Sequence, residues 1–552
     1  MEQCMNNYRM IVLSSLEKVF PHEEPVFSPE CCRFSGLYGE TLSFQSACCF
    51  KGLRKETLKV RVSSALKDSI RVRQVVNVPS AYPAHEKRDS NYLNRGPGLY
   101  PDLLRDLEDD SLVLVPGHWQ SLWIDVAIPD AIPGDIYPVT LSLVDSQDKE
   151  MVSITASIEV IPVQLPAQEL LHTEWFHGDC LADYYKVPVF SEEHWNILEQ
   201  FISLYGKRGM NMILTPIFTP PLDTAVGGER TTIQLVSIIQ ENNRFLFNFS
   251  RLERWVDICK NAGIRYFEMA HLFTQWGAYH APKIMVTRDG KEIRLFGWDT
   301  PSTGAYTAFL DQFLPALKEE LNRLGILENT FFHISDEPEK DHLESYARAR
   351  ESVIAHLKDC KLLDALSDYS FYESGIVERP ACAIDHIEPF LDHQVPHLWS
   401  YYCTAQCVDV ANRFMAMPSA RNRVYGLQVY KYGIEGILHW GFNFYNSDYS
   451  RRHINPYEVT DCEGSFPSGD AFLVYPGPHG IPEESIRLMV LSEATQDQRA
   501  LKLLEHYIGK EAVIELLEED LSEPITFRSY PKSNAYFMGM RNKINRMIKR
   551  YI

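Results

Sequence analysis

Residues 191–216, SEEHWNILEQFISLYGKRGMNMILTP, carry the pattern that decides the fold. Ser191 suits a helix N-cap, the apolar positions after it recur at helical spacing, and Gly209 stands where a C-terminal cap belongs. The apolar run at 212–216 is short enough to be a buried strand. The stretch therefore predicts a helix over 191–208, followed directly by a strand.

The same alternation of strand and helix continues through most of the chain. Further helical patterns cover 250–262, 303–324, 339–357 and 418–432, with Ser250 as a predicted N-cap and Gly263 and Gly325 as C-terminal caps. Eight strands are predicted, at 170–175, 212–216, 265–270, 330–335, 361–367, 382–384, 396–401 and 436–441. Eight such units in roughly 280 residues are typical of a (β/α)8 barrel. A doubly wound sheet is the alternative, although no glycine-rich phosphate turn follows any of the strands.

The first part of the chain has a different pattern. Apolar and polar residues alternate with period two, and Pro and Gly residues separate the runs at 57–62, 121–126, 137–144 and 152–160. Short alternating strands with such turns predict a β-sandwich. We therefore predict a multidomain β plus α/β protein: a β-sandwich domain over 1–166, a (β/α)8 barrel catalytic domain over 167–515 and a C-terminal helical tail over 516–552.

Composition and charge exclude several classes of function. The 552 residues are 45% hydrophobic and 23% charged, as in a globular protein. A net charge of −20 disfavours nucleic acid as a partner, and no apolar stretch is long enough to predict a membrane span. The first residues lack a secretory signal pattern, and the 12 cysteines include no CxxC motif, so we expect reduced thiols and a cytoplasmic protein. The oligomeric state is left open.

Basic residues dominate the end of the chain after Glu523. The run from Arg528 to Arg550 predicts a solvated surface helix, and a contact with a partner is the alternative.

In a barrel, catalytic groups lie at the C-terminal ends of the strands. These ends carry carboxylates, imidazoles and aromatic rings, which suit proton transfer to a carbohydrate and stacking on it. We expect substrate contacts from Asp179, His271, Trp276, Tyr369, Trp399, Tyr402, Trp440 and Asn443. A core position is the alternative for His271, Trp399, Tyr402 and Trp440. Glu268, His271 and His280 match no zinc-ligand spacing, so no metal site is predicted.

Asp336-Glu337-Pro338 is the sharpest candidate for chemistry. The proline predicts an extended backbone at Glu337, and Pro338 itself suits the first position of a helix. Both carboxyl groups can turn into a pocket where the strand breaks off, and two close carboxyl groups raise each other's pKa, so that one stays protonated as a general acid. The alternative is that one of them caps the next helix. Neighbours on one strand end approach a sugar from one side, which fits one acid, one orienting group and a nucleophile supplied by the substrate, such as a 2-acetamido group.

The run HISDEP at 333–338 resembles the catalytic domain of glycoside hydrolase family 123, also known as domain of unknown function 4091. The stretches WFHGDCLAD at 175–183, GILHWG at 436–441 and GDAFLVYPG at 469–477 resemble the same family, so that the resemblance covers roughly 170–499. It implies a β-sandwich before a (β/α)8 barrel, and exo-acting, retaining hydrolysis of terminal β-N-acetylgalactosamine with the substrate's acetamide as nucleophile. It implies Glu337 as general acid/base and Asp336 as the group that holds the acetamide N–H, with no metal or organic cofactor.

Two other functions remain open on the sequence alone. One is a glycosidase that acts on other sugars with a protein nucleophile such as Glu268, Asp368 or Asp385. The other is a non-catalytic carbohydrate-binding protein that keeps the barrel as a scaffold.

Overall fold

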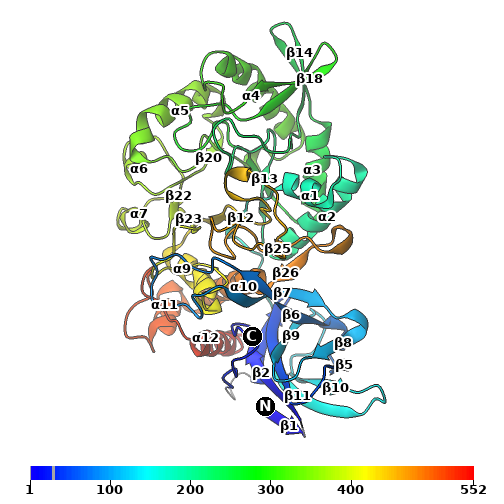
Figure 1. The fold of residues 1–552 in the computed structure, drawn as a ribbon. Coiled ribbons are helices and arrows are strands. Elements are labelled where there is room, and N and C mark those ends of the chain that lie inside the picture. Colours follow the sequence, from blue (N-terminus) through cyan, green and yellow to red (C-terminus); the bar gives the residue numbers. More distant parts are fainter. Residues whose placement is uncertain (1, 6, 28–31) are drawn as a thin grey trace.

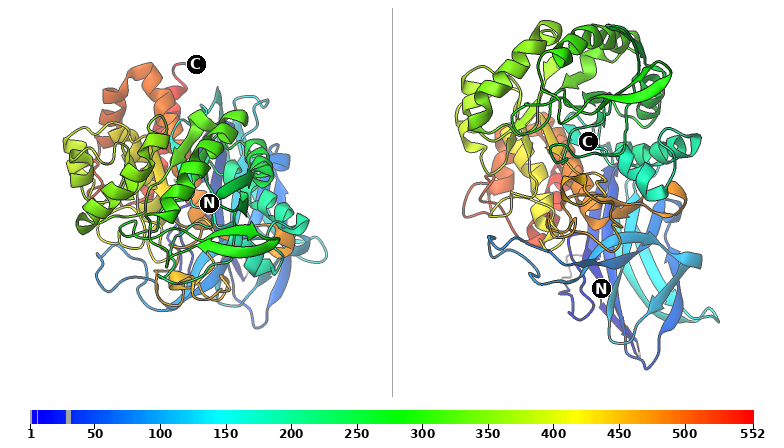
Figure 2. Two further views of the ribbon diagram at one scale, coloured as in Figure 1. Left: turned by 90° about the horizontal axis from the view of Figure 1, so that it is seen from above. Right: turned by 45° about the horizontal axis from the view of Figure 1, so that its top comes forward.

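The computed structural model describes residues 2–5, 7–27 and 32–552. Strands of the N-terminal part occupy one end of the molecule, a parallel barrel with surrounding helices occupies the other, and α10 (Ile486–Ile508) lies between them (Figure 1). Figure 2 shows the same arrangement from two further sides, with the green barrel helices on the far side of the molecule from the blue and cyan strands.

The N-terminal part is built from two sheets. The first has the order β1-β2-β4-β9-β6-β7-β26-β25 and the second the order β3-β11-β10-β5-β8. Buried side chains of both sheets, among them Phe44, Leu122, Leu141 and Ile154, share one hydrophobic cluster, because alternate residues of each strand face the opposite sheet. The strands of the first sheet are β1 (Glu2–Met5), β2 (Tyr8–Ser14), β4 (Thr41–Phe50), β9 (Trp119–Ala127), β6 (Ile70–Ser80), β7 (Gly98–Asp106), β26 (Glu483–Ser485) and β25 (Val474–Tyr475). Those of the second are β3 (Arg33–Tyr38), β11 (Glu150–Gln164), β10 (Ile136–Val144), β5 (Glu56–Ser63) and β8 (Ser111–Leu114).

The barrel is a nearly closed sheet of nine parallel strands, in the order β20-β19-β16-β13-β12-β24-β23-β22-β21. The two edge strands, β20 and β21, are separated in the chain by Leu363 alone. Each predicted segment overlaps one strand, except 361–367, which contains these two. The bounds are β12 (Leu171–Glu174), β13 (Met212–Thr215), β16 (Tyr266–Met269), β19 (Thr330–Phe332), β20 (Lys361–Leu362), β21 (Asp364–Leu366), β22 (Pro380–Ala383), β23 (Trp399–Tyr401) and β24 (Gly436–His439).

Helices follow most of these strands. The Ser191 side chain accepts a hydrogen bond from the His194 N–H at the start of α2, which confirms that N-cap. The predicted Ser250 cap is wrong: Phe249 is the N-cap, and Ser250 is the first helical residue, with its hydroxyl bonded to Asn248. The helices are α1 (Gly178–Tyr185), α2 (Glu192–Lys207), α3 (Ser250–Asn261), α4 (Ala305–Arg323), α5 (Leu343–Leu357), α6 (Ser370–Glu373), α7 (Glu388–Asp392), α8 (Ser419–Arg423) and α9 (Tyr425–Tyr432).

Two long loops after β13 and β16 contribute a small additional sheet. Its order is β15-β14-β17-β18, and it projects from the barrel end of the molecule (Figure 1). The strands are β14 (Ser237–Glu241), β15 (Arg244–Asn248), β17 (Ile284–Arg288) and β18 (Lys291–Phe296). The remainder of the two loops is thereby held over the C-terminal ends of the barrel strands.

The C-terminal tail packs on the N-terminal part. The end of the chain contains α11 (Lys510–Glu518), which crosses the predicted boundary at 515/516, and α12 (Asn534–Ile548). Arg541 of α12 is buried and pairs with Glu40 (2.7 Å) and Asp497 (3.1 Å). The prediction of a solvated surface helix is wrong for Arg541, which pairs with buried acids of the same chain, whereas Arg546, Lys549 and Arg550 are exposed as predicted. The predicted domain boundaries stay predictions; β25 and β26, which fall within the predicted barrel domain, belong to the first N-terminal sheet.

Two further expectations concern thiols and membranes. The nine described cysteines from Cys48 to Cys462 form no disulfide bonds. No helix in the described part of the chain has the length and apolar character needed to cross a membrane.

Candidate active site

A cavity of about 250 Å³ opens at the C-terminal ends of the barrel strands. Its floor is apolar and closed: Trp175 is 3% exposed and Leu438 is 4% exposed. Its mouth is open, since Trp276 is 37% exposed. The other lining residues come from strand ends and from loops: Leu222, Asp223, Gln275, Asp336, Glu337, Ala365, Tyr401, Cys403, Thr404, Ala405, Trp440 and Phe466.

Asp336 and Glu337 lie side by side in this cavity. The backbone of Glu337 is left-handed (φ +43°) and its N–H donates to the Ala365 carbonyl (3.1 Å), so the prediction of an extended backbone is wrong. On a regular strand neighbouring side chains point to opposite faces, whereas this turn lets both carboxyl groups face one cavity. The predicted position of Pro338 is also wrong, because Glu339 caps the helical turn that follows. The capping role considered for Asp336 or Glu337 therefore belongs to Glu339.

Asp336 is held from the loop after β16. Gln275 Nε2 donates to Asp336 Oδ2 (3.2 Å), and the Trp276 N–H donates to the Asp336 carbonyl (3.1 Å). Burial, and then the neighbouring charge of Glu337, raise the pKa of Asp336 well above its ordinary value. The site thus resists a negative charge on Asp336 unless another group compensates it.

Glu337 is held from the opposite wall. The Tyr401 hydroxyl, at the end of β23, donates to Glu337 Oε1 (2.8 Å). Burial raises the pKa of Glu337, this hydrogen bond opposes the rise, and the charges of Asp470 and Glu339 add to it. Two adjacent carboxyl groups whose pKa values are both raised suit a pair in which one is protonated while the other is ionised.

A charged layer lies beneath the cavity floor. Glu268, inside the barrel, accepts hydrogen bonds from Thr173 Oγ1 (2.7 Å), Trp175 Nε1 (2.7 Å) and His333 Nε2 (2.6 Å). His333 Nδ1 lies 3.3 Å from Asp364 Oδ1. Burial alone would lower the pKa of His333, but the two carboxylates raise it to about 10. The protonated His333 therefore holds Glu268 in place, and Glu268 in turn anchors the Trp175 indole that forms the floor.

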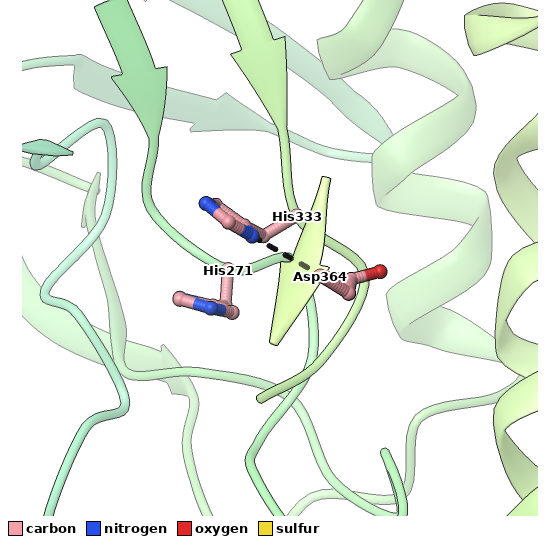
Figure 3. Close-up of side chains that lie close together, drawn as sticks. All are labelled: His271, His333 and Asp364. Atoms are coloured by element: carbon pink, nitrogen blue, oxygen red, sulfur yellow. Dashed lines mark hydrogen bonds and ion pairs between the residues drawn. The ribbon is translucent and has the colours of Figure 1, made fainter. Parts of the chain in front are cut away.

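Three buried side chains beside this layer come near enough to hold a metal ion. They are His271, His333 and Asp364, whose donor atoms lie within 4.8 Å of one another (Figure 3). The His271 ring stacks on His333 at 4.3 Å, and its two nitrogens have no partner among the described residues. His333, however, uses both ring nitrogens for its carboxylates, so that a metal would have to displace a firmly held proton. A hydrogen-bonded Glu268–His333–Asp364 triad, with the imidazolium between two acids, accounts for the contacts better than a metal centre does.

One further buried acid fixes part of the cavity wall. Asp470 accepts hydrogen bonds from Trp440 Nε1 (2.9 Å), from His439 Nε2 (3.2 Å) and from the Thr404 hydroxyl. Burial alone would raise the pKa of Asp470, but the bond from His439 lowers it below its ordinary value. Asp470 is therefore an anion that orients two lining side chains.

The structure brings two of the eight predicted substrate contacts to the cavity, Trp276 and Trp440. The others make contacts within the protein outside the lining: Asp179 pairs with Arg230 (2.7 Å), His271 packs beside Trp175, Tyr369 stacks on His393 (4.7 Å), Trp399 is buried in the barrel interior, Tyr402 packs on Tyr425, and Asn443 bonds to His177.

Several lining residues were missed by the sequence reasoning. Tyr401 had a usable signal, because it is two residues after Trp399 on one strand and so faces the same side. Asp223, Gln275, Thr404 and Phe466 lie on loops and had none.

Paired carboxyl groups in a cavity walled by indole rings, at the C-terminal end of a parallel barrel, form the site of a carbohydrate-cleaving enzyme. Residues 175–504 match the model of the glycoside hydrolase 123 catalytic domain. This match spans more than half of the chain, and the chain belongs to glycoside hydrolase family 123. The resemblance of the sequence to this family is thereby confirmed.

Among solved structures, a family 123 glycoside hydrolase from Clostridium perfringens, studied for glycolipid glycan hydrolysis, has a TM-score of 0.75 at 16% identity, over 99% of this chain and 98% of that one. The two proteins share a fold. A family 2 β-galacturonidase from Eisenbergiella tayi has a TM-score of 0.31 at 11% identity, over 87% of this chain and 72% of that one, which is too low to bear on the fold. No curated protein matches the chain.

Proposed function

We propose that this glycoside hydrolase is an exo-acting, retaining β-N-acetylhexosaminidase that releases terminal β-N-acetylgalactosamine with the substrate's acetamide as nucleophile. One observation carries the proposal: Asp336 and Glu337 are adjacent in the chain, share one cavity and both have raised pKa values. Such a pair supplies one proton donor and one hydrogen-bond acceptor on one side of the sugar.

In this mechanism Glu337 gives its proton to the glycosidic oxygen as the bond to the anomeric carbon breaks. The acetamide oxygen forms a new bond to that carbon, and a cyclic oxazolinium-like intermediate results. Asp336, ionised at this point, accepts the acetamide N–H, whose partial positive charge grows in the transition state. Glu337 then takes a proton from water, the water oxygen bonds to the anomeric carbon, and the ring opens with net retention.

The lining of the cavity supports a neutral sugar. Among the described lining residues, Asp223, Asp336 and Glu337 carry carboxyl groups and none is Lys or Arg. An acidic sugar would meet like charges without a counter-ion. Ala365 and Leu438 offer apolar surface at the closed end, which suits the methyl group of an acetamide.

The alternative with a protein nucleophile has less support. Both oxygens of Glu268 accept hydrogen bonds from buried neighbours, and the residue does not line the cavity. Asp368 Oδ1 accepts a hydrogen bond from the Ser370 N–H (2.9 Å), Asp385 Oδ1 accepts one from Gln406 Nε2 (2.9 Å), and neither residue lines the cavity.

We also propose that the nine barrel strands represent a (β/α)8 barrel in which β20 and β21 are one interrupted strand. The single residue between them supports this count. The shared core of the two N-terminal sheets supports a β-sandwich.

A panel of nitrophenyl glycosides tests the activity. The wild type should hydrolyse the β-N-acetylgalactosaminide and leave the β-galactoside intact, because only the first carries the nucleophile. Cleavage of the galactoside with similar efficiency would reject substrate assistance. Binding of the N-acetyl sugar with no turnover of any substrate would favour a carbohydrate-binding protein. Glycolipid glycans, for which the Clostridium relative was studied, are the first natural substrates to try.

A further inference from the structure

We infer that Trp276, Tyr449 and Asp223 form a second sugar-binding position at the mouth of the cavity, which receives the sugar on the leaving side of the scissile bond. The inference rests on the proposed function and extends it to the sugar to which the terminal N-acetylgalactosamine is linked.

The positions of the terminal sugar and of the leaving-group sugar are assigned from their depth in the cavity. An exo-acting enzyme holds the terminal sugar at the closed end, which here is formed by the buried Trp175 and Leu438. The leaving group then faces the open end. Glu337, which must reach the oxygen between the two sugars, is half-buried, whereas Asp336 is buried. The order from floor to mouth is therefore Asp336, Glu337 and then Trp276.

Two exposed rings form a platform at this mouth: Trp276 lines the cavity, and Tyr449, outside the lining, packs edge-on against it. Trp276 and Tyr449 are each 37% exposed, and their rings lie 6.0 Å apart at 79°. Both have left-handed backbones, with φ of 56° and 50°, which is uncommon for bulky residues and is retained where a fixed position matters. The hydrogen bond from the Trp276 N–H to the Asp336 carbonyl (3.1 Å) ties the platform to the catalytic pair. The Arg451 guanidinium covers one face of the Tyr449 ring (4.9 Å), so the exposed face of Trp276 is the one that suits the C–H face of a sugar ring, with Tyr449 beside it.

Asp223 supplies the polar group beside these rings. The backbone N–H groups of Tyr449 and Ser450 bond to its carboxylate, and the Ser450 hydroxyl donates to its carbonyl (2.8 Å). Its Oδ2 atom is buried and has no donor in the described part of the protein, although the residue lines the cavity. Buried acceptors are nearly always paired in folded proteins. When the carboxyl group turns toward the cavity, a sugar hydroxyl at the mouth provides the missing donor.

The test compares two substrates that differ only in the leaving group. One is a disaccharide with N-acetylgalactosamine β-linked to galactose, and the other is methyl β-N-acetylgalactosaminide, whose methyl group leaves the mouth empty. Nitrophenyl glycosides are unsuitable, because their ring could lie on the platform. Asp223→Asn, Trp276→Ala and Tyr449→Ala are compared with the wild type. Tyr279→Ala is the matched control, because Tyr279 is 49% exposed in the same loop as Trp276 but packs on His342 instead of on Trp276.

We expect Asp223→Asn to lower kcat/KM for the disaccharide by about 10- to 100-fold, as for the loss of a hydrogen bond to a charged group, and to leave the methyl glycoside nearly unaffected. Retained turnover of the methyl glycoside also shows that the variant is folded. Equal losses on both substrates would place Asp223 with the terminal sugar, and no loss on either would remove it from binding; both results overturn the inference. A wild type that hydrolyses neither substrate would instead contradict the proposed function.

Discussion

The hydroxyl of Tyr401 donates a hydrogen bond of 2.8 Å to Glu337 Oε1, although the two residues are 64 positions apart in the chain. Glu337 follows β19 and Tyr401 ends β23, so the bond joins two parts of the barrel mouth. A donor at this point stabilises the ionised carboxylate and fixes the orientation of the group that must deliver a proton.

Tyr401→Phe should therefore raise the pKa of Glu337 further. Without the donor the ionised form loses a hydrogen bond, and the basic limb of the kcat/KM profile should move upward by about one pH unit. The shift must be upward, because activity that needs protonated Glu337 is lost only when the pH exceeds the pKa of Glu337. A pH–rate profile of wild type and variant measures this, and a limb that stays in place or moves downward would contradict the role of Tyr401.

Glu337→Gln should lower turnover of substrates with poor leaving groups by about 10²- to 10⁴-fold, the usual contribution of a positioned general acid. Activated aryl glycosides need less protonation and should lose less. Kinetics on a methyl and a dinitrophenyl N-acetylgalactosaminide provide the comparison. The same loss on both substrates would take the acid role away from Glu337.

Asp336→Asn should lower turnover but increase thermal stability. Burial and Glu337 raise the folded-state pKa of Asp336, so the wild type loses stability as the pH rises from the unfolded value of about 4 through the folded value. Asn removes this penalty and can still accept the bond from Gln275. The Tm of the variant should exceed that of the wild type at neutral pH and approach it at low pH. A Tm below that of the wild type at every pH would show that Asp336 stabilises the fold.

Substitutions of the stacked residues His333 and His271 should have different effects on the free energy of unfolding. His333→Phe leaves Glu268 and Asp364 buried without their cation and should cost about 3–5 kcal/mol. His271→Phe removes two nitrogens that have no described partner and keeps the stack, so its cost should be below about 1 kcal/mol. Urea denaturation of both variants measures the difference. Similar costs would show that the charged triad does not dominate this layer.

Regular elements were predictable from the sequence because their signals are local. The strands, the Ser191 cap and the alternation of strand and helix all rest on residues within one or two turns of each other. The backbone of Glu337 was not predictable, because its hydrogen bond to Ala365, 28 residues further along the chain, overrides the preference set by the following proline.

The residues of the site also fall into those with a local sequence signal and those positioned by distant parts of the chain. Tyr401 could have been chosen over Tyr402 from strand alternation, since Trp399 and Tyr401 both face the barrel interior. Asp223 could not, because the residue that positions it, Ser450, lies 227 positions further along the chain. Adjacent carboxyl groups were visible in the sequence, whereas the walls around them depend on how the loops pack.

The central claim, that the substrate's acetamide is the nucleophile, is tested most directly by a series of nitrophenyl β-N-acylgalactosaminides. The acyl group is acetyl, fluoroacetyl, difluoroacetyl and then trifluoroacetyl, and kcat/KM of the wild type is measured for each. Fluorine withdraws electrons from the carbonyl oxygen that attacks the anomeric carbon. The account predicts a steep fall in kcat/KM with each added fluorine. A nearly constant kcat/KM across the series would contradict it and would assign the nucleophile to the protein.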